Sequence, residues 1–210
     1  MRKMKFCHAN IDVSRKVFAP RIETEFWVSR AIEEIEKIKK PLKILDIFSG
    51  TGCIGISILK TVKNATVCFI DSDRRAIEQI KINLRLNKIP EKRYKIYQSN
   101  LFEKLSSRRK YDFILANPPY VALDRLYEVQ KEVLEKEPHI ALFAGKDGLF
   151  CIKKFFDKVK NYLKPEGIIF LEFDPHQKED IEKILKKQGF KFVFKKDQFK
   201  KYRWIKVGNF

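Results

Sequence analysis

The segment 43–71 constrains the fold of this chain more than any other feature. An apolar run at 43–48 leads into a glycine loop at 49–55, from which an apolar helical pattern continues. A second apolar run at 66–70 ends in Asp71. Short apolar runs bounded by glycine and proline predict buried strands. Two such strands joined through a helix predict a parallel strand–helix–strand unit, in a sheet with helices on both faces.

The glycine loop predicts that the chain binds a nucleotide-like cofactor. Gly50, Gly52 and Gly55 form the G-x-G-x-x-G pattern, and an acid at the tip of the second strand, Asp71, can bind ribose hydroxyls. NAD enzymes share this pattern and are an alternative. Asp46 argues against them, because its carboxylate repels a pyrophosphate but attracts the ammonium group of a methionine moiety. The segment therefore favours S-adenosyl-L-methionine over a dinucleotide.

A proline-rich loop after the next apolar run predicts the chemistry. The run 111–116 ends in Asn117, Pro118, Pro119 and Tyr120. A site that methylates a planar NH2 group must accept hydrogen bonds from both of its N–H groups, because the nitrogen lone pair is otherwise delocalised. Asn117 offers a side-chain carbonyl, Pro118 a backbone carbonyl and Tyr120 a ring for stacking. We expect these three residues to be catalytic and the whole Asn-Pro-Pro-Tyr loop to bind the substrate; the alternative is a turn that only ends a strand.

The composition predicts one soluble domain of 210 residues. Apolar residues make up 44% and charged residues 34%, and no stretch reaches the roughly 20 apolar residues of a membrane span. The basic start lacks the apolar region of a signal peptide. The four cysteines and three histidines are scattered, which predicts neither disulfides nor a bound metal and fits a reducing cytoplasm.

The net charge of +18 raises the question of an RNA-rich partner. Lysine and arginine number 45 against 27 acidic residues, as in proteins that work near the ribosome or on RNA. The lysines are spread over the chain rather than gathered in one block, so a general compositional bias explains the charge equally well. The charge alone does not identify the substrate.

The remaining patterns extend the unit to a whole α/β domain. Residues 6–18 alternate loosely, as in a short hairpin, and Thr24 is suited to cap a helix that reaches Lys39. Strands alternating with helices predict a mainly parallel sheet, and two consecutive strands at the end predict an antiparallel edge hairpin. The other expected elements are helices at 73–87, 123–134, 149–163 and 178–188, and strands at 94–97, 168–173, 190–195 and 202–207.

These motifs resemble the bacterial protein-(glutamine) methyltransferases that modify peptide chain release factors, within the class I S-adenosyl-L-methionine methyltransferase (Rossmann-like) fold. That fold is a seven-stranded, mostly parallel sheet with an antiparallel edge and helices on both faces. The resemblance covers nearly the whole chain from about Phe6. The motifs that carry it are residues 20–25 (PRIETE), 45–52 (LDIFSGTG), 117–120 (NPPY) and 137–149 (EPHIALFAGKDGL).

The resemblance implies a role for each matched position. Asp71 would contact the ribose, and Asn100 and Leu101 would lie beside adenine. Asn117 and Pro118 would hold the amide of the glutamine in a Gly-Gly-Gln motif of a release factor, with Tyr120 stacked on it. The residues expected around S-adenosyl-L-methionine are Asp46, Phe48, Ser49, Gly50, Thr51, Gly52, Asp71, Asn100, Leu101 and Asn117.

The chain departs from the family pattern at three places. Phe48 stands where the family has the first glycine of its loop, and Asn100 replaces the usual Asp. Only about nineteen residues precede the PRIETE motif, so we expect residues 1–19 to be an extension or hairpin and 20–210 to be the methyltransferase domain. The family's helical N-terminal domain is then absent, and release factor recognition would rely on surface charge, on the tripeptide or on an activating partner subunit.

Two further functions are compatible with these motifs. One is methylation of an exocyclic amino group of an RNA or DNA base, since the same loop chemistry serves a flipped base and lysines alternate with aromatic residues at 191–206. That tail equally fits an edge hairpin with an apolar and a charged face. The other is a non-catalytic module that only binds S-adenosyl-L-methionine, which the intact Asn-Pro-Pro-Tyr loop disfavours.

Overall fold

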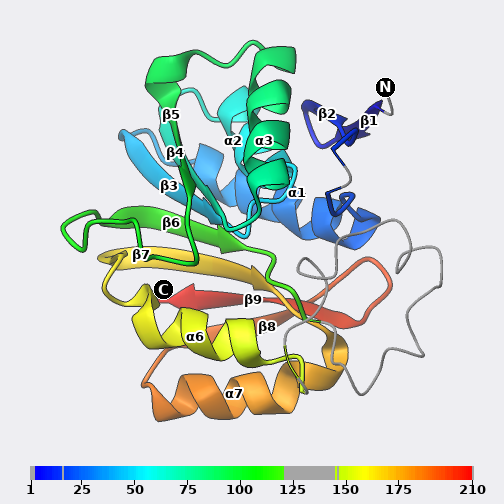
Figure 1. Cartoon of the computed structure of the whole chain (residues 1–210). Helices are drawn as coiled ribbons and strands as arrows, with labels where there is room; N and C mark the ends of the chain where they lie inside the picture. Colours follow the sequence, from blue (N-terminus) through cyan, green and yellow to red (C-terminus); the bar gives the residue numbers. More distant parts are fainter. Residues whose placement is uncertain (1–2, 16, 121–144, 146, 210) are drawn as a thin grey trace.

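The computed structural model describes residues 3–15, 17–120, 145 and 147–209 (Figure 1). Its centre is a seven-stranded sheet of order β5-β4-β3-β6-β7-β9-β8, in which β9 runs antiparallel to β7 and β8. The expected class I methyltransferase fold, including its antiparallel edge hairpin, is confirmed. The strands of the sheet are β3 (Leu42–Ile47), β4 (Ala65–Asp71), β5 (Tyr94–Gln98), β6 (Tyr111–Ala116), β7 (Leu163–Glu172), β8 (Phe192–Lys196) and β9 (Tyr202–Gly208).

Helices cover both faces of this sheet, because its central strands are apolar on both sides. In β6, Phe113 and Leu115 join one core, whereas Ile114 and Ala116 join the other. The first core lies under α1, α2 and α3, and the second under α6 and α7. The bounds of these helices are α1 (Ile22–Glu36), α2 (Cys53–Thr61), α3 (Arg74–Leu86), α6 (Phe150–Val159) and α7 (Lys178–Lys187).

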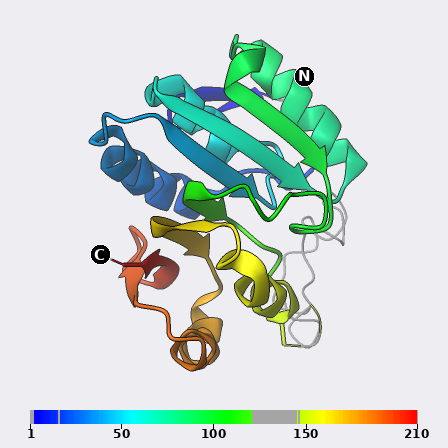
Figure 2. The same ribbon diagram turned by 90° about the vertical axis from the view of Figure 1, so that its left-hand side faces the viewer.

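The register of the sheet brings four strand ends together. Ile47 of β3 pairs with Ile70 of β4 and with Ala116 of β6, and Ala116 pairs with Leu171 of β7. These parallel strands therefore end at one edge (Figure 2). Ligands of open α/β sheets bind outside the carboxyl ends of the strands. The loops that follow β3, β4, β6 and β7 thus define the candidate site.

A small hairpin, β1 (Lys3–Phe6) and β2 (Ala9–Asp12), packs beside α2 and α3. Side-chain amides along α3 hold it: Asn87 exchanges two hydrogen bonds with the backbone of Asn10, and Asn83 Oδ1 accepts from the backbone N–H of Asp12 at 2.8 Å. Asn83 Nδ2 also donates to the carbonyl of Thr51 in the glycine loop at 2.9 Å. The hairpin expected within 6–18 lies nearer the start of the chain, because these amides fix its position.

Three expected boundaries were wrong. The helix expected to end at 163 already ends at Val159, because Leu163 begins β7. Thr24 is not the helix cap, because α1 already begins at Ile22 and the Thr24 hydroxyl bonds to a distant carboxylate. Strand β7 begins at Leu163 rather than at 168, since a register shift opposite β6 accommodates the Pro165 turn within the strand. The helix expected at 123–134 and most of the 137–149 motif lie outside the described residues.

Candidate functional site

The glycine loop connects β3 to α2 through left-handed backbone. Gly50 and Gly52 have φ of 53° and 77°, and Phe48, directly before the loop, has φ of 61°. A residue with a side chain is disfavoured there by about 1–2 kcal/mol, so Phe48 occupies a position that suits the glycine expected from the family. Its ring packs near Phe155 of α6, with centroids 6.5 Å apart. This contact with the second core offsets part of the strain.

Ser49 fastens the glycine loop to the neighbouring strand. Its backbone N–H donates to the Ile70 carbonyl at 3.0 Å, and its hydroxyl accepts from the Ile70 N–H at 2.9 Å. The hydroxyl also donates to the carbonyl of Asp46 at 2.7 Å. These bonds occupy the side chain within the protein. Ser49 therefore shapes the site rather than presenting its hydroxyl to a ligand.

Asp46 lies beneath the loop with one free acceptor. Its side chain is 0% exposed, and Oδ2 accepts from the backbone N–H of Gly55 at 2.9 Å. Within the described part of the chain, neither Oδ1 nor the hydroxyl of Thr51 has a hydrogen-bond partner. Burial raises the pKa of Asp46 well above its usual value, and the nearby charge of Asp71 adds to this. A buried acceptor of this kind fits an ammonium group brought to the loop.

Gly55 is required by close packing rather than by its backbone angles. A Cβ at this position would lie 2.4 Å from the ring of Phe69 in β4. The third glycine of the pattern therefore lets α2 approach the sheet, which is the role the pattern predicts. Its N–H is then aimed at Asp46.

Asp71 at the tip of β4 organises two segments at once. Oδ2 accepts from the backbone N–H of Gly50 at 2.8 Å, and Oδ1 accepts from the N–H of Asp73 at 2.9 Å. Burial raises the pKa of Asp71, which these two N–H groups partly counteract. A side chain built on Gly50 would meet no described heavy atom within 4 Å. The carboxylate thus lies beside open space at the edge of the sheet.

The tip of β5 lies next to Asp71. The Ser99 N–H donates to the carbonyl of Asp71 at 2.9 Å. The following Asn100 is exposed, with its amide nitrogen donating to Glu103 Oε1 at 2.9 Å, and Leu101 has a left-handed φ of 49°. The side-chain carbonyl of Asn100 can accept a hydrogen bond from an amino group. Asn100 and Leu101 are therefore close in space to the residue expected to bind ribose.

The Asn-Pro-Pro-Tyr loop is held by a buried carboxylate that the sequence did not reveal. Thr24 Oγ1 and Trp27 Nε1 donate to Glu172 Oε2 at 2.7 and 2.6 Å. The hydroxyl of Tyr120 donates to Glu172 Oε1 at 3.4 Å, and Asn117 Nδ2 donates to Thr24 Oγ1 at 3.3 Å. Helix α1, the Asn-Pro-Pro-Tyr loop and the end of β7 thus meet at one side chain.

Glu172 is 1% exposed and ends β7. Burial raises its pKa, and the bonds from Trp27 and Thr24 oppose that rise. The only available sequence signal was its position, an acid at the end of an apolar strand like Asp46 and Asp71. Thr24 of the PRIETE motif lies 148 residues from Glu172, and no pattern along the sequence links the two.

The two prolines and Tyr120 are fixed from both sides. Pro118 is buried and Pro119 half-buried, and the carbonyl of Tyr120 accepts from Gln177 Nε2 at 3.2 Å. Burial and the nearby charge of Glu172 raise the pKa of the Tyr120 phenol, so it remains a neutral donor. Tyr120 is thus tied to Glu172 by its hydroxyl as well as being available for ring contacts.

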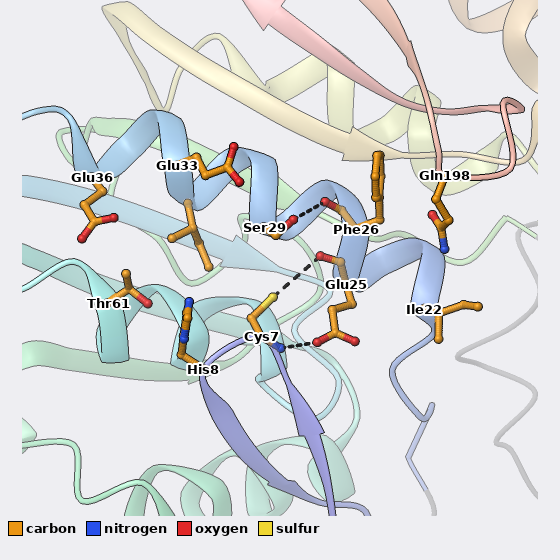
Figure 3. A pocket seen from close by; sticks show the side chains of 11 residues that line it. Cys7, His8, Ile22, Glu25, Phe26, Ser29, Glu33, Glu36, Thr61 and Gln198 are labelled. Carbon is orange, nitrogen blue, oxygen red and sulfur yellow. Dashed lines mark hydrogen bonds between the residues drawn. The ribbon is translucent and has the colours of Figure 1, made fainter.

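A separate pocket of about 460 Å³ lies between the hairpin turn and the outer face of α1 (Figure 3). The backbone N–H of Cys7 donates to Glu25 Oε1 there at 2.5 Å. Burial, together with the nearby charge of Glu25, raises the pKa of the Cys7 thiol to about 12, which disfavours the nucleophilic thiolate. None of the residues expected to bind cofactor or substrate lines this pocket.

Two other kinds of site are not found in the part of the chain that the structure describes. No group of three or more His, Cys, Asp or Glu side chains there is arranged to hold a metal ion. No helix among the same residues has the length and apolar character that crossing a bilayer requires.

Sequence comparison matches residues 3–146 to the methyltransferase small domain family. Similar curated proteins include release factor glutamine methyltransferases of Fusobacterium nucleatum (36% identical), Flavobacterium psychrophilum (35%) and Lactococcus lactis (34%). The matches cover 85%, 93% and 97% of this chain. The chain spans 49%, 69% and 73% of those relatives, respectively.

Solved structures with the same fold are more distant in sequence. The catalytic domain of hMettl16, in complex with MAT2A 3'UTR hairpin 6, matches with a TM-score of 0.74 and 16% identity, over 97% of this chain and 76% of that one. The ribosomal protein L11 methylase of Lactobacillus delbrueckii subsp. bulgaricus matches with a TM-score of 0.67 and 16% identity, over 92% and 81%. At this level of identity the likeness concerns the fold.

Proposed function

The chain belongs to the methyltransferase small domain family and to the release factor glutamine methyltransferases, and from this premise we propose its reaction. It transfers a methyl group from S-adenosyl-L-methionine to the side-chain amide nitrogen of the glutamine in the Gly-Gly-Gln motif of peptide chain release factors. The domain that does so comprises residues 20–210, and residues 1–19 are an N-terminal extension that contains the hairpin β1–β2.

One observation carries this proposal. The glycine loop and the Asn-Pro-Pro-Tyr loop leave adjacent strands at the same level, since Ile47 of β3 pairs with Ala116 of β6. A cofactor on the first loop and a planar amide on the second would therefore be neighbours. Bringing donor and acceptor together in a fixed orientation is the main requirement of a direct transfer.

The residues of the glycine loop fit S-adenosyl-L-methionine. Oδ1 of Asp46 and the hydroxyl of Thr51, which have no hydrogen-bond partner among the described residues, are suited to the polar end of a methionine moiety. Asp71, beside the open space at Gly50, is suited to ribose hydroxyls, and Asn100 with Leu101 to adenine. When bound, the cofactor supplies an electrophilic methyl group on a sulfonium centre.

The Asn-Pro-Pro-Tyr loop performs the positioning. The side-chain carbonyl of Asn117 and the backbone carbonyl of Pro118 accept hydrogen bonds from the substrate NH2 group. Its nitrogen lone pair then points away from both carbonyls, towards the glycine loop. Tyr120 packs on the amide plane, and the buried Pro118 helps to exclude water from it. No covalent intermediate with the protein is needed, and the surplus proton leaves to solvent.

Mass spectrometry of a Gly-Gly-Gln-bearing release factor, incubated with the protein and S-adenosyl-L-methionine, tests the proposal. We expect a single added methyl on that glutamine, and none on a release factor with Gly-Gly-Asn in its place. Parallel samples of rRNA and duplex DNA test the alternative substrate class. Methylated nucleic acid beside an unmodified release factor would overturn the proposal. Addition of a bacterial lysate depleted of small molecules tests whether an activating partner subunit or ribosomes are required.

A further inference from the structure

The carboxylate of Glu172 accepts hydrogen bonds from three side chains. The indole N–H of Trp27 can only donate, and it does so to Oε2 at 2.6 Å. The same oxygen lies 2.7 Å from Thr24 Oγ1. An oxygen that already accepts a short bond from an indole is the acceptor for its second neighbour as well, so the Thr24 hydroxyl proton is directed at Glu172.

Because the hydroxyl of Thr24 has given its one proton to Glu172, it can only accept a hydrogen bond from its other neighbour. Asn117 is that partner, 3.3 Å away. The oxygen and nitrogen of a carboxamide occupy nearly identical positions, and only the hydrogen-bond network distinguishes them. Against a hydroxyl that has already given its proton away, the Asn117 nitrogen makes a hydrogen bond, whereas its oxygen would meet another acceptor.

We propose that Glu172, acting through Thr24, is a positioning residue that fixes the orientation of the Asn117 side-chain amide. This chain of hydrogen bonds from Asn117 through Thr24 to Glu172, called the relay below, turns the side-chain nitrogen of Asn117 towards Thr24. The side-chain oxygen of Asn117 is then left for the substrate. This inference deepens the proposed function and rests on it, because a substrate NH2 group needs an oxygen at this point. A flipped Asn117 would present N–H to N–H and repel the substrate amide.

The geometry limits what else this cluster can do. Glu172 is 1% exposed, and among the described residues its links to the Asn-Pro-Pro-Tyr loop run through Thr24 and the Tyr120 hydroxyl. It has no open path to a substrate nitrogen and is therefore not a general base. Its effect on the reaction passes through the direction of hydrogen bonds.

A matched pair of variants at Thr24 tests the relay. Thr24→Val keeps the shape but removes the hydroxyl, and Thr24→Ser keeps the hydroxyl. We expect Val to lower kcat/KM for the release factor by roughly 10- to 100-fold, the loss of one buried directional bond, and Ser by less than about threefold. In an Asn117→Ala background, Thr24→Val is expected to have almost no further effect, because the relay acts only through Asn117.

A second pair at Glu172 keeps the test decisive if Thr24→Val does not fold. For Glu172→Gln, kcat/KM should stay within about fivefold of the parent's. The indole N–H of Trp27 can only donate, so it faces the amide oxygen of the new glutamine, and the Thr24 hydroxyl still donates to that oxygen. Glu172→Met, of similar length, frees the Thr24 hydroxyl to donate to Asn117 and should lower kcat/KM by roughly 10-fold or more. Equal losses for Gln and Met would overturn the relay.

A readout on the free protein separates this inference from the proposed function. In 15N-labelled protein without substrate, one side-chain N–H of Asn117 should exchange slowly with water in the parent and in Thr24→Ser, and rapidly in Thr24→Val. Uniform exchange in all three would overturn the relay, as would a Thr24→Val loss that persists in full without Asn117. Failure of the parent to methylate any release factor would instead overturn the proposed function, while the exchange result still decides the relay.

Discussion

The glycine loop and the Asn-Pro-Pro-Tyr loop share one edge of the sheet but are held in opposite ways. The hydrogen bonds of the glycine loop join residues that are close in sequence: Gly55 and Asp46 are 9 residues apart, and Gly50 and Asp71 are 21 apart. The bonds of the Asn-Pro-Pro-Tyr loop are long: Tyr120 lies 52 residues from Glu172, and Thr24 lies 148 from it. The first loop is built by its own strand–helix–strand unit, the second by three separate segments.

This difference implies a division of labour. A loop fixed by local backbone bonds keeps its shape when distant parts of the chain change. A loop fixed through one buried carboxylate depends on the packing of α1 against β7. Cofactor binding and methyl transfer should therefore respond to different substitutions, and the following variants test that separation.

The largest effect is expected from Asn117→Ala. Removing the carboxamide takes away one of the two acceptors that orient the substrate NH2 group, so turnover should fall by about 100-fold or more. Affinity for S-adenosyl-L-methionine, measured by isothermal titration, should stay largely intact and change far less than turnover, because most of the residues expected around the cofactor belong to the independently held glycine loop. A parallel loss of cofactor binding would break the division between the loops.

Asp71→Ala should weaken cofactor binding at the glycine loop. It leaves the N–H groups of Gly50 and Asp73 without their carboxylate and removes the acid expected on ribose. We expect the Kd for S-adenosyl-L-methionine to rise about 10- to 100-fold. Asp73→Ala is the matched control: it removes a cap on the Arg75 N–H, costs roughly 1 kcal/mol of stability, and should leave the Kd unchanged. Equal weakening in both variants would contradict the assigned role.

Asp46→Asn should raise stability while weakening cofactor binding. The folded pKa of Asp46 lies above its unfolded value, so the folded protein binds the extra proton. Stability from this group is therefore complete below the unfolded pKa, about 4, and falls as pH rises through the folded pKa. The asparagine side chain does not ionise, so the variant does not lose stability as the pH rises. Its Tm should therefore exceed the parent's by a few degrees at pH 8 and by less at pH 5. Calorimetry showing the reverse pH trend would contradict the cause.

The smallest effect is expected at Phe48, where two variants distinguish backbone strain from side-chain packing. Phe48→Gly and Phe48→Ala both lose the contact with Phe155, but only glycine tolerates a φ of 61° without cost. We expect the glycine variant to be more stable than the alanine variant by about 1 kcal/mol in urea denaturation. Equal stabilities would mean that the backbone relaxes when the ring is removed.

Much of the architecture could be read from local patterns. The strand at 111–116 and, within the described residues, the expected order of strands and helices agree with the structure, because apolar runs and glycine punctuation depend on near neighbours. The hairpin was misplaced, since the amides of Asn83 and Asn87 that hold it lie more than 70 residues away in sequence. A hydroxyl near a helix start predicts a cap at Thr24, whereas the structure directs this hydroxyl to Glu172.

The sequence by itself determined the parallel unit, its glycine loop and the presence of an Asn-Pro-Pro-Tyr loop after a buried strand. Only the tertiary structure decided that Glu172 lies beneath that loop and that Thr24 and Trp27 donate to it. The physical reason is that a buried carboxylate must find its donors wherever the packed chain supplies them. Such pairing leaves no periodic signal along the sequence, whereas burial of a strand does.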